Sequence, residues 1–433
     1  MTKTPAGKNS VLEITPAKVE GEVRVPGSKS LTNRSLIVAA LAPPSSIIHG
    51  ALFSDDTRYL SSALAELGFV ILNFPEDTRF TIDGREGDIP AKKSKLFVGN
   101  SGTAMRFLTA FVALGKGTFE LDGVERMRQR PIQPLLDCLT QLGADAVSKH
   151  GDGCPPVIIK ANGLKGGKAT MRGDLSSQYF TAILLTAPYA HRDVEIVVKG
   201  ELVSRLYVDM TIKFMKMFGV KVTHDRHKRF TIRAGQRYQP LVYEVEGDAS
   251  SASYFLAAAA ITGGRVKVHG IPLNSLQGDT GFVQVLSKMG AFVQRGDDWI
   301  EVEGGPPLRG IDIDLGNCPD MAQTVAALAV FARGKTRVRG VANLRIKETD
   351  RINAVVTELK RIGITAKEHK DGFEITPGKP KPAVIETYDD HRMAMSFALI
   401  GLRAKGIKIK DPHCVSKTFP EYFEELKKLC QTD

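Results

Sequence analysis

"LGF" at residues 67–69 ends an apolar, helix-like segment. Near copies of this tripeptide recur along the chain, and their spacing indicates the architecture of the fold. The copies are "LGA" (142–144), "FGV" (218–220), "MGA" (289–291) and "IGI" (362–364), and a last one without glycine ends near Leu429–Cys430. Successive glycines lie 75, 76, 71 and 73 residues apart. A glycine directly after a periodic apolar segment is a helix stop signal, so the spacing predicts six similar modules of about seventy residues.

Each module follows one order of elements. A polar turn opens an apolar, Ala-rich helix, and a β-like run such as "VEIVVKG" (194–200) or "GRVKVHG" (264–270) comes next. A second, amphipathic helix then ends at the glycine, and strands such as "RFTIRA" (229–234) or "WIEVEG" (299–304) follow. This order predicts an α/β protein built from six βα units.

The turns that open the first helices share a composition. They read "PGSKSLTNR" (26–34), "GNSGTAMR" (99–106), "GDLSSQYF" (173–180), "GDASSASYF" (247–255), "GNCPDMAQ" (316–323) and "YDDHRMAM" (388–395). Helix capping explains their Gly, Ser, Asn and Asp, and it is sufficient for Ser250 and Ser251. It does not explain Lys29, Arg34, Gln178, Asp320, His391 and Arg392. Cations oppose the helix dipole unless an anion binds there, so the turns predict a small ligand with several negative charges.

"RIKETDRINAVV" (345–356) poses the same question, because it predicts a helix with Lys347, Glu348 and Arg351 in its first turns. Lys347 and Arg351 are four residues apart and would share a face. An ordinary alternative stays open for two acids. Glu348 could merely pair with Arg351 at i, i+3, and Asp320 could merely cap a helix.

Bulk composition narrows the class of protein. The 433 residues suit two or three domains, and the net charge of +11 is spread over the chain. Short apolar runs, the polar start "MTKTPAGKNS" and five cysteines without a CxxC pair favour a cytoplasmic protein with no membrane span, disulfide framework or zinc site. His224 and His227 in "THDRHK" (223–228) have no cysteine nearby, so no metal is expected there.

Seven ordered motifs carry a family resemblance from about residue 11 to the end. They are "VPGSKSLTNRSLIVAALA" (25–42), "NSGTAMRF" (100–107), "RMRQRPIQPL" (126–135), "GDLSSQYFTAILL" (173–185), "KETDRI" (347–352), "YDDHRMAM" (388–395) and "KTFPEYFEEL" (417–426). The chain resembles the 5-enolpyruvylshikimate-3-phosphate synthase (3-phosphoshikimate 1-carboxyvinyltransferase) family. The resemblance implies an α/β fold of two similar domains, each with three βαβαββ repeats (an inside-out α/β barrel), and an active site in the interdomain cleft. The repeats then place one domain at 1–24 with 246–433 and the other at 25–245.

The resemblance also implies a reaction of the shikimate pathway, toward chorismate and the aromatic amino acids. The enolpyruvyl group of phosphoenolpyruvate moves to the 5-hydroxyl of shikimate 3-phosphate, through a tetrahedral intermediate, and phosphate leaves. No metal or organic cofactor is implied. The family is expected to act as a monomer, with no nucleic-acid or membrane partner.

Residue by residue, the resemblance gives Glu348 as the acid/base at C3, Asp320 as the base for the 5-hydroxyl, and Lys29 in contact with both substrates. For phosphoenolpyruvate it implies Lys29, Gly102, Arg130, Gln178, Arg351, Arg392 and Lys417. For shikimate 3-phosphate it implies Lys29, Ser30, Arg34, Ser176, Ser177, Gln178, Ser204, Tyr207, Asp320, Asn343 and Lys347. Asn100 and His391 match motif positions near the same site.

Phe107 departs from the family, because many members have Pro after "GTAMR". Gly102 suggests room for glyphosate, an inhibitor that competes with phosphoenolpyruvate, so we expect sensitivity; Phe107 leaves its degree open. Two alternatives remain. A UDP-N-acetylglucosamine enolpyruvyltransferase usually has Cys or Asp in the loop before "RP", and "GVERMRQRP" (123–131) has neither. An RNA-end-processing or nucleic-acid-binding protein would fit the charge, but the basic residues are not interleaved with aromatic ones.

Overall fold

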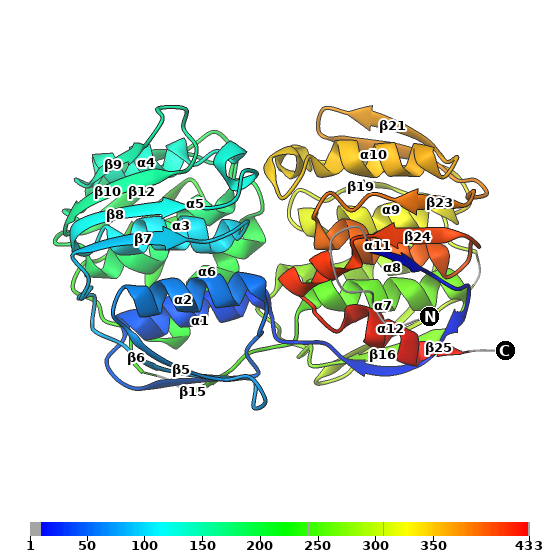
Figure 1. Ribbon diagram of the computed structural model, residues 1–433, viewed down its shortest axis with the longest axis horizontal. Helices are drawn as coiled ribbons and strands as arrows, with labels where there is room; N and C mark the ends of the chain where they lie inside the picture. Colours follow the sequence, from blue (N-terminus) through cyan, green and yellow to red (C-terminus); the bar gives the residue numbers. More distant parts are fainter. Residues whose placement is uncertain (1–9, 241, 306, 432–433) are drawn as a thin grey trace. The chain divides into compact units, whose positions relative to one another are not determined.

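The computed structural model describes residues 10–240, 242–305 and 307–431. The chain divides into two compact units. Unit 1 holds the described residues up to Pro26 together with those from Glu246 onward, and unit 2 runs from Gly27 to Val245. Each unit contains three modules, and the six modules expected from the glycine spacing are found in the described ranges (Figure 1).

The second module of unit 2 shows the complete pattern. Its elements are β7 (Lys93–Phe97), α3 (Gly102–Val112), β8 (Lys116–Asp122), α4 (Gln133–Gln141), β9 (Asp145–Ser148) and β10 (Val157–Asn162). The strands form a sheet in the order β7-β8-β10-β9, in which β7 and β8 are parallel and the other pairs are antiparallel. This is a βαβαββ unit, as predicted.

Two other modules repeat this order without interruption. The one in unit 2 consists of β11 (Gly167–Arg172), α5 (Ser177–Thr186), β12 (Val194–Lys199), α6 (Arg205–Met217), β13 (Val222–Asp225) and β14 (Arg229–Ile232). The one in unit 1 consists of β19 (Asp312–Asp314), α9 (Ala322–Val330), β20 (Thr336–Arg339), α10 (Arg351–Arg361), β21 (Thr365–His369) and β22 (Gly372–Thr376). Both sheets have the same mixture of one parallel and two antiparallel pairs.

The remaining modules borrow a strand from a distant part of the chain. In unit 2, β15 (Val242–Glu244) completes α1 (Lys29–Leu41), β4 (Ser46–His49), α2 (Asp55–Glu66), β5 (Val70–Phe74) and β6 (Arg79–Asp83). In unit 1, β3 (Gly21–Arg24) completes α7 (Ala249–Thr262), β16 (Arg265–His269), α8 (Phe282–Met289), β17 (Phe292–Arg295) and β18 (Trp299–Glu303). Strand β15 pairs in parallel with β4, and β3 pairs in parallel with β16. The pairing of β3 with β16 makes unit 1 discontinuous in sequence.

The last module of unit 1 is closed by the N-terminal strands. It contains β23 (Ala383–Ile385), α11 (His391–Gly401), β24 (Ile407–Lys410) and α12 (Tyr422–Leu429). Strand β1 (Val11–Glu13) pairs antiparallel with β24, and β2 (Lys18–Val19) pairs with β25 (Cys430–Gln431). The first and last segments of the described chain therefore belong to the same unit.

The predicted helix stops are confirmed. Helices α2, α4, α6, α8 and α10 end just before Gly68, Gly143, Gly219, Gly290 and Gly363. These glycines have φ of +93°, +91°, +87°, +102° and +79°, the left-handed region that side chains with a Cβ disfavour. Helix α12, which lacks the glycine, continues instead into the extended Cys430.

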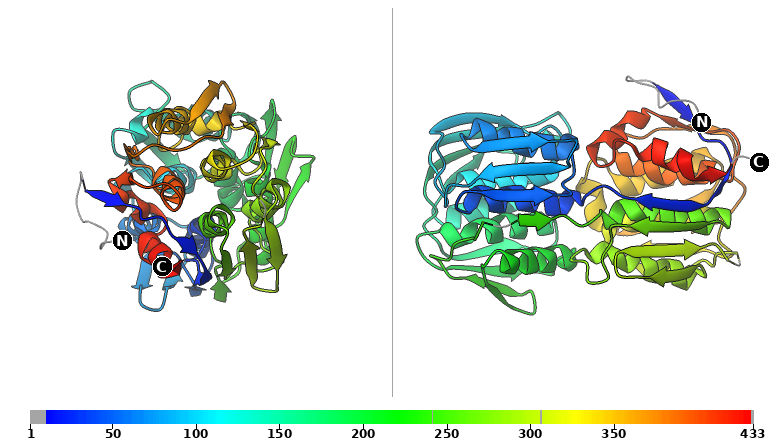
Figure 2. Two further views of the ribbon diagram at one scale, coloured as in Figure 1. Left: turned by 90° about the vertical axis from the view of Figure 1, so that its right-hand side faces the viewer. Right: turned by 90° about the horizontal axis from the view of Figure 1, so that it is seen from below.

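The first helix of every module lies at the centre of its unit. Helices α1, α3 and α5 pack together in unit 2, and α7, α9 and α11 pack together in unit 1, where the end-on view of Figure 2 shows them side by side. A helix that is apolar on all sides is stable only when it is buried all round, which explains the Ala-rich runs. Their N-terminal turns are the motif-bearing segments. Among the described residues, none of these helices has the length and apolar character required to span a bilayer.

One local prediction was wrong. Lys347 and Glu348 do not lie in the first turn of a helix, because α10 begins at Arg351. Asp350 is the N-cap, and its side chain accepts the Asn353 N–H at 3.0 Å. Lys347 and Glu348 belong to the loop between a 3-10 turn (Ala342–Ile346) and this cap. An aspartate with a good capping geometry sets the helix start later than the apolar periodicity alone indicated.

Candidate active site

Arg351 is the centre of a buried ionic cluster in unit 1. Its side chain is 2% exposed. Its Nε and Nη2 donate to the two oxygens of Asp390 at 2.7 and 3.1 Å, and its Nη1 donates to Asp320 at 3.1 Å. Glu348 Oε2 lies 2.9 Å from Nη2. Burial alone would lower the pKa of this guanidinium, but Asp390, Glu348 and Asp320 outweigh it and hold the pKa above its ordinary value.

Asp320 receives cations from three elements. Arg392 Nη2 donates to its Oδ2 at 3.0 Å, Arg351 donates to Oδ1, and Lys347 Nζ lies 4.0 Å from Oδ1. Burial raises the pKa of this carboxyl, but Arg392, Lys347 and Arg351 together lower it well below its usual range. Asp320 lies in a 3-10 turn (Pro319–Met321) before α9, and its charge faces cations. Helix capping alone therefore does not account for it.

Glu348 forms the i, i+3 ion pair with Arg351 that the ordinary alternative proposed, although the pair lies at the helix entrance and not inside it. The carboxylate is buried, with 8% exposure. A surface ion pair would leave both groups in water. Burial beside a guanidinium that already binds two aspartates places this carboxylate in a water-poor environment, which is typical of functional carboxylates.

Four other predicted residues of unit 1 are also buried, whereas the Lys347 side chain is 23% exposed. Arg392 follows His391 at the start of α11 and donates through Nη1 to the Tyr254 hydroxyl at 3.1 Å. Burial raises the pKa of Tyr254 to about 12, so it stays a neutral hydrogen-bonding partner. The remaining positions, all buried, are Asn343, His391 and Lys417.

In unit 2, Arg34 is a buried cation held by neutral oxygens. Its Nε donates to Thr211 at 2.9 Å, Nη1 to the Ser30 carbonyl at 2.7 Å, and Nη2 to the Tyr207 carbonyl at 3.2 Å. The guanidinium also lies 5.6 Å from the centre of the Phe107 ring. Burial lowers the pKa of Arg34, because its bonds are to neutral oxygens. An added anion would restore the balance of charge.

Lys29 lies at the start of α1, beside Arg34's helix turn. Its Nζ lies 3.4 Å from Oδ2 of Asp56, a carboxylate that is 2% exposed at the start of α2. The buried aspartate helps to fix the position of the ammonium group, whose side chain is 14% exposed.

The N-termini of α3 and α5 form a second polar group in unit 2. Arg130 Nη1 donates to the Asn100 backbone and side-chain oxygens at 2.9 and 3.0 Å. A Cβ on Gly102 would lie 2.4 Å from Arg130 Nη2, so a larger residue there would push this guanidinium from its position. Gln178 Nε2 donates to the Thr103 hydroxyl at 3.1 Å, which links the two helix starts.

The predicted serines mark helix starts. Ser176 caps α5 by accepting the Gln178 N–H at 3.2 Å, and Ser177 is the first helical residue. Ser204 precedes α6 with a left-handed φ of +53°, and Tyr207 follows in the first turn of α6. Capping thus explains Ser176. A strained non-glycine residue such as Ser204 is typical of a functional segment.

The sequence prediction missed Asp390. This carboxylate is fully buried, caps α11 by accepting the Arg392 N–H at 2.9 Å, and accepts hydrogen bonds from Nε and Nη2 of Arg351. The available signal was its place beside His391 and Arg392 in "YDDHRMAM". Asp56 was missed as well, and no motif marked it.

The architecture and the clusters define an α/β protein of two three-module units, in which cations and carboxylates gather near helix N-termini. The chain belongs to the EPSP synthase (3-phosphoshikimate 1-carboxyvinyltransferase) family, whose family model matches residues 14–426. The resemblance carried by the seven motifs is therefore confirmed.

Relatives and solved structures agree with this family. The chain is 49% identical over 413 residues to a 3-phosphoshikimate 1-carboxyvinyltransferase of Nostoc punctiforme, covering 95% of this chain and 97% of the relative. A protein of the same name from a Sulfurovum strain is 48% identical over 414 residues, with 95% and 97% covered. A solved EPSP synthase of Acinetobacter baumannii superposes with a TM-score of 0.81 at 28% identity, covering 98% of both chains. These names do not favour the UDP-sugar or RNA alternatives.

Proposed function

We propose that this protein is a transferase of the shikimate pathway. It moves the enolpyruvyl group of phosphoenolpyruvate to the 5-hydroxyl of shikimate 3-phosphate and releases phosphate. The observation that carries the proposal is the buried cluster in which Arg351, Arg392 and Lys347 face Asp320 while Glu348 lies against Arg351. The reaction needs cations for phosphates and carboxylates, and carboxylates that carry protons.

Asp320 acts as the base that removes the proton of the 5-hydroxyl. In the substrate-free cluster its pKa is too low for a strong base, because three cations surround it. Anionic substrate groups that bind Arg392, Arg351 and Lys347 neutralise part of this positive charge. The pKa of Asp320 then rises, so substrate binding itself makes the carboxylate basic.

Glu348 gives a proton to C3 of the enol, which makes C2 electrophilic, and the 5-oxygen adds to C2. The tetrahedral adduct expels phosphate, and Glu348 takes a proton back from C3. Arg351 holds the carboxylate through a 2.9 Å contact, which fixes its position for both transfers. Arg351, Arg392 and Lys417 bind phosphoenolpyruvate, and Lys347 and Asn343 bind shikimate 3-phosphate.

The residues of unit 2 serve the same two substrates. Arg130 and Gly102 bind phosphoenolpyruvate, with Asn100 orienting Arg130 through two hydrogen bonds. Arg34 compensates the phosphate charge of shikimate 3-phosphate. The remaining assignments are Ser30, Ser176, Ser177, Ser204 and Tyr207 for shikimate 3-phosphate, and Lys29 and Gln178 for both substrates, with His391 near the reacting groups.

The proposal extends to the setting of the enzyme. It includes two domains, at 1–24 with 246–433 and at 25–245, a division supported by the two compact units, whose boundaries fall at Pro26–Gly27 and Val245–Glu246. The enzyme works in the cytoplasm as a monomer, without nucleic-acid or membrane partners, and without a metal or organic cofactor in its reaction. Glyphosate inhibits it by competing with phosphoenolpyruvate.

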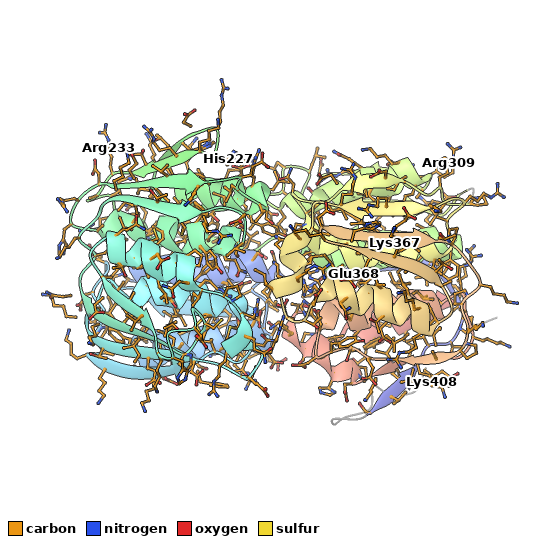
Figure 3. The ribbon with its side chains drawn as sticks, turned by 90° about the horizontal axis from the view of Figure 1, so that it is seen from above. His227, Arg233, Arg309, Lys367, Glu368 and Lys408 are labelled. Carbon is orange, nitrogen blue, oxygen red and sulfur yellow. The ribbon has the colours of Figure 1, made fainter. Side chains whose placement is uncertain are left out.

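The testing experiment measures phosphate release from phosphoenolpyruvate with shikimate 3-phosphate or UDP-N-acetylglucosamine as acceptor. Release is expected only with shikimate 3-phosphate, and Glu348→Gln should lose at least a hundredfold in kcat. Glu368→Gln is the matched control, because Glu368 pairs with Arg345 at 2.7 Å on β21, where Figure 3 labels it. Release with the UDP-sugar acceptor, or none with either, would contradict the proposal. Wild-type kcat in Glu348→Gln would remove Glu348 from the mechanism.

A further inference from the structure

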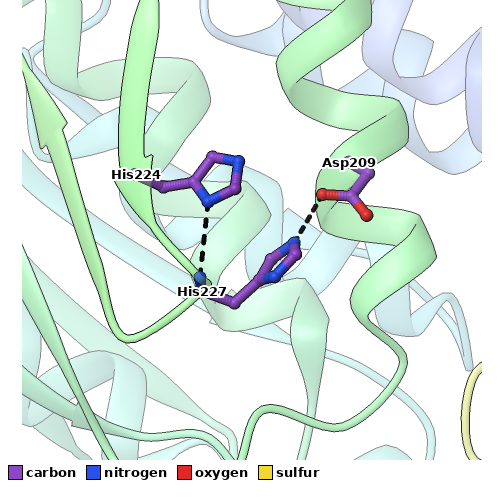
Figure 4. Close-up of side chains that lie close together, drawn as sticks. All are labelled: Asp209, His224 and His227. Carbon is purple, nitrogen blue, oxygen red and sulfur yellow. Dashed lines mark hydrogen bonds and ion pairs between the residues drawn. The ribbon is translucent and has the colours of Figure 1, made fainter.

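Asp209, His224 and His227 form a compact cluster in unit 2 that the proposed reaction does not use (Figure 4). His227 Nε2 lies 2.6 Å from Asp209 Oδ1, and one ligand-type atom from each of the three residues lies within 4.8 Å of the others. From the sequence we expected no metal here, because no cysteine lies near the two histidines. The fold supplies the third ligand, Asp209, from α6, fifteen residues earlier in the chain than His224.

The hairpin of β13 and β14 holds the two rings together. Arg226 and His227 both have left-handed φ, +43° and +60°, and the Lys228 N–H closes the turn on the Asp225 carbonyl at 2.7 Å. The centres of the His224 and His227 rings lie 4.6 Å apart. A turn of this kind costs conformational energy at residues other than glycine, and here it turns His227 back toward α6.

We propose that this cluster is a binding site for a divalent transition-metal ion of the Zn²⁺ class. Two imidazoles and one carboxylate are a donor set that Zn²⁺ accepts, with water as a fourth ligand. Donor atoms about 2.0–2.1 Å from a tetrahedral ion lie roughly 3.3 Å from one another. The His227–Asp209 contact therefore opens by less than 1 Å and His224 moves inward, adjustments within the reach of side-chain torsions at partly exposed residues.

The ring nitrogens define how the ion binds. His224 Nδ1 accepts the His227 backbone N–H at 3.3 Å, a long hydrogen bond. When Nε2 of His224 binds the ion, the proton moves to Nδ1 and this hydrogen bond is lost. His227 binds through the same Nε2 that faces Asp209 in the apo state. The ion thus replaces a proton shared between His227 and Asp209, and it ties the hairpin to α6.

The ligand types also set the selectivity. Imidazole and carboxylate donors bind Cu²⁺ more tightly than Zn²⁺ or Ni²⁺. Mg²⁺ and Ca²⁺ require more oxygen ligands than the cluster offers, so they should not compete.

Isothermal titration of the full-length, untagged chain with ZnCl₂ tests the proposal. We expect one Zn²⁺ per chain in the wild type, and binding at least tenfold weaker in Asp209→Asn and in His224→Gln. His150→Gln, at an exposed histidine on another module, is the matched control and should bind as the wild type does. Asp209→Asn keeps the side-chain shape and a hydrogen-bond acceptor for His227, so its fold should be preserved.

A second measurement does not depend on variants. Zn²⁺ added to the wild-type protein should shift the imidazole NMR signals of His224 and His227 and leave those of His150 unchanged, and EDTA should reverse the shifts. Absence of Zn²⁺ binding in the wild type would overturn the proposal. So would equal binding by all variants, or shifts confined to other histidines.

Discussion

We predict that Glu358 stabilises the turn directly before Asp390, the aspartate of unit 1 that binds Arg351. Tyr388 and Asp389 both have left-handed φ, +55° and +53°, directly before Asp390. This conformation costs about 1–2 kcal/mol per residue outside glycine, so the turn stores roughly 2–4 kcal/mol. Other contacts must offset that cost for the turn to persist.

The side chain of Glu358 is fully buried and accepts four hydrogen bonds. Two of them hold the turn: the Glu386 N–H donates at 3.1 Å and the Tyr388 hydroxyl donates at 2.7 Å. The other two come from Arg361, whose side chain is 43% exposed. Hydrogen bonds to a charged group contribute about 1.5–3 kcal/mol each, so the two bonds to the turn are comparable with its strain.

Glu358→Ala and Glu358→Gln separate geometry from charge. Alanine removes both bonds to the turn, and we expect a loss of about 3 kcal/mol in unfolding free energy and at least a tenfold fall in kcat/KM. Glutamine can accept the Glu386 N–H and donate to the Tyr388 oxygen. It loses only the pair with exposed Arg361, which contributes at most about 1 kcal/mol.

The assay is urea unfolding followed by steady-state phosphate release for both variants. The kinetic prediction rests on the proposed reaction, whereas the unfolding prediction does not. Wild-type stability in Glu358→Ala would refute the argument that these bonds offset the strain. Equal losses in both variants would show that the charge of Glu358 matters more than its hydrogen bonds to the turn.

Three further perturbations follow from the site. Gly102→Ala should raise KM for phosphoenolpyruvate at least tenfold, because the added Cβ would lie 2.4 Å from Arg130 Nη2. The urea midpoint should change little. An unchanged KM would place Arg130 outside the phosphoenolpyruvate site. Phe107→Leu removes the ring 5.6 Å from Arg34, a contact that contributes about 0.5–2 kcal/mol, and should raise KM for shikimate 3-phosphate several-fold in steady-state kinetics. Asp320 has a lowered folded-state pKa, so its contribution to stability is present above about pH 4 and is lost as the pH falls through the folded value. Urea unfolding between about pH 5 and pH 2 should therefore show a shallower decline in Asp320→Asn than in the wild type.

Much of the fold was predictable because its signals are local. A helix that ends at Gly68 or Gly290 needs a residue that tolerates positive φ, and this requirement is visible in the sequence wherever it occurs. The N-terminal turns were recognisable for the same reason, since a cap acts within three residues of itself. The pairings of β3 with β16 and of β15 with β4 were not predicted, because the sequence of a strand that pairs in parallel does not identify its partner.

The candidate site was predictable as a set of residues but not as a set of contacts. The motifs predicted that Arg351 and Asp320 are charged residues near helix starts. They did not predict that Asp390 is the main partner of Arg351, because that contact depends on the packing of α10 against α11. The error at Lys347 has a related origin. Apolar periodicity reports which face of a helix is buried, whereas its first residue depends on which nearby side chain caps it.

The sequence alone does not show whether the pKa of a charged residue is raised or lowered, because that depends on its burial and its partners. Arg34 and Arg351 are both buried arginines near helix starts, but neutral oxygens surround the first and three carboxylates surround the second. The pKa of Arg34 is therefore lowered and that of Arg351 is raised. Arg34 has no carboxylate among these partners, so its charge is open to an anion, whereas Arg351 also holds Glu348 and Asp320 in place, in addition to the phosphoenolpyruvate contact proposed for it. The same residue type at the same kind of position thus binds a ligand against neutral oxygens in one unit, and in the other positions carboxylates as well as binding a ligand.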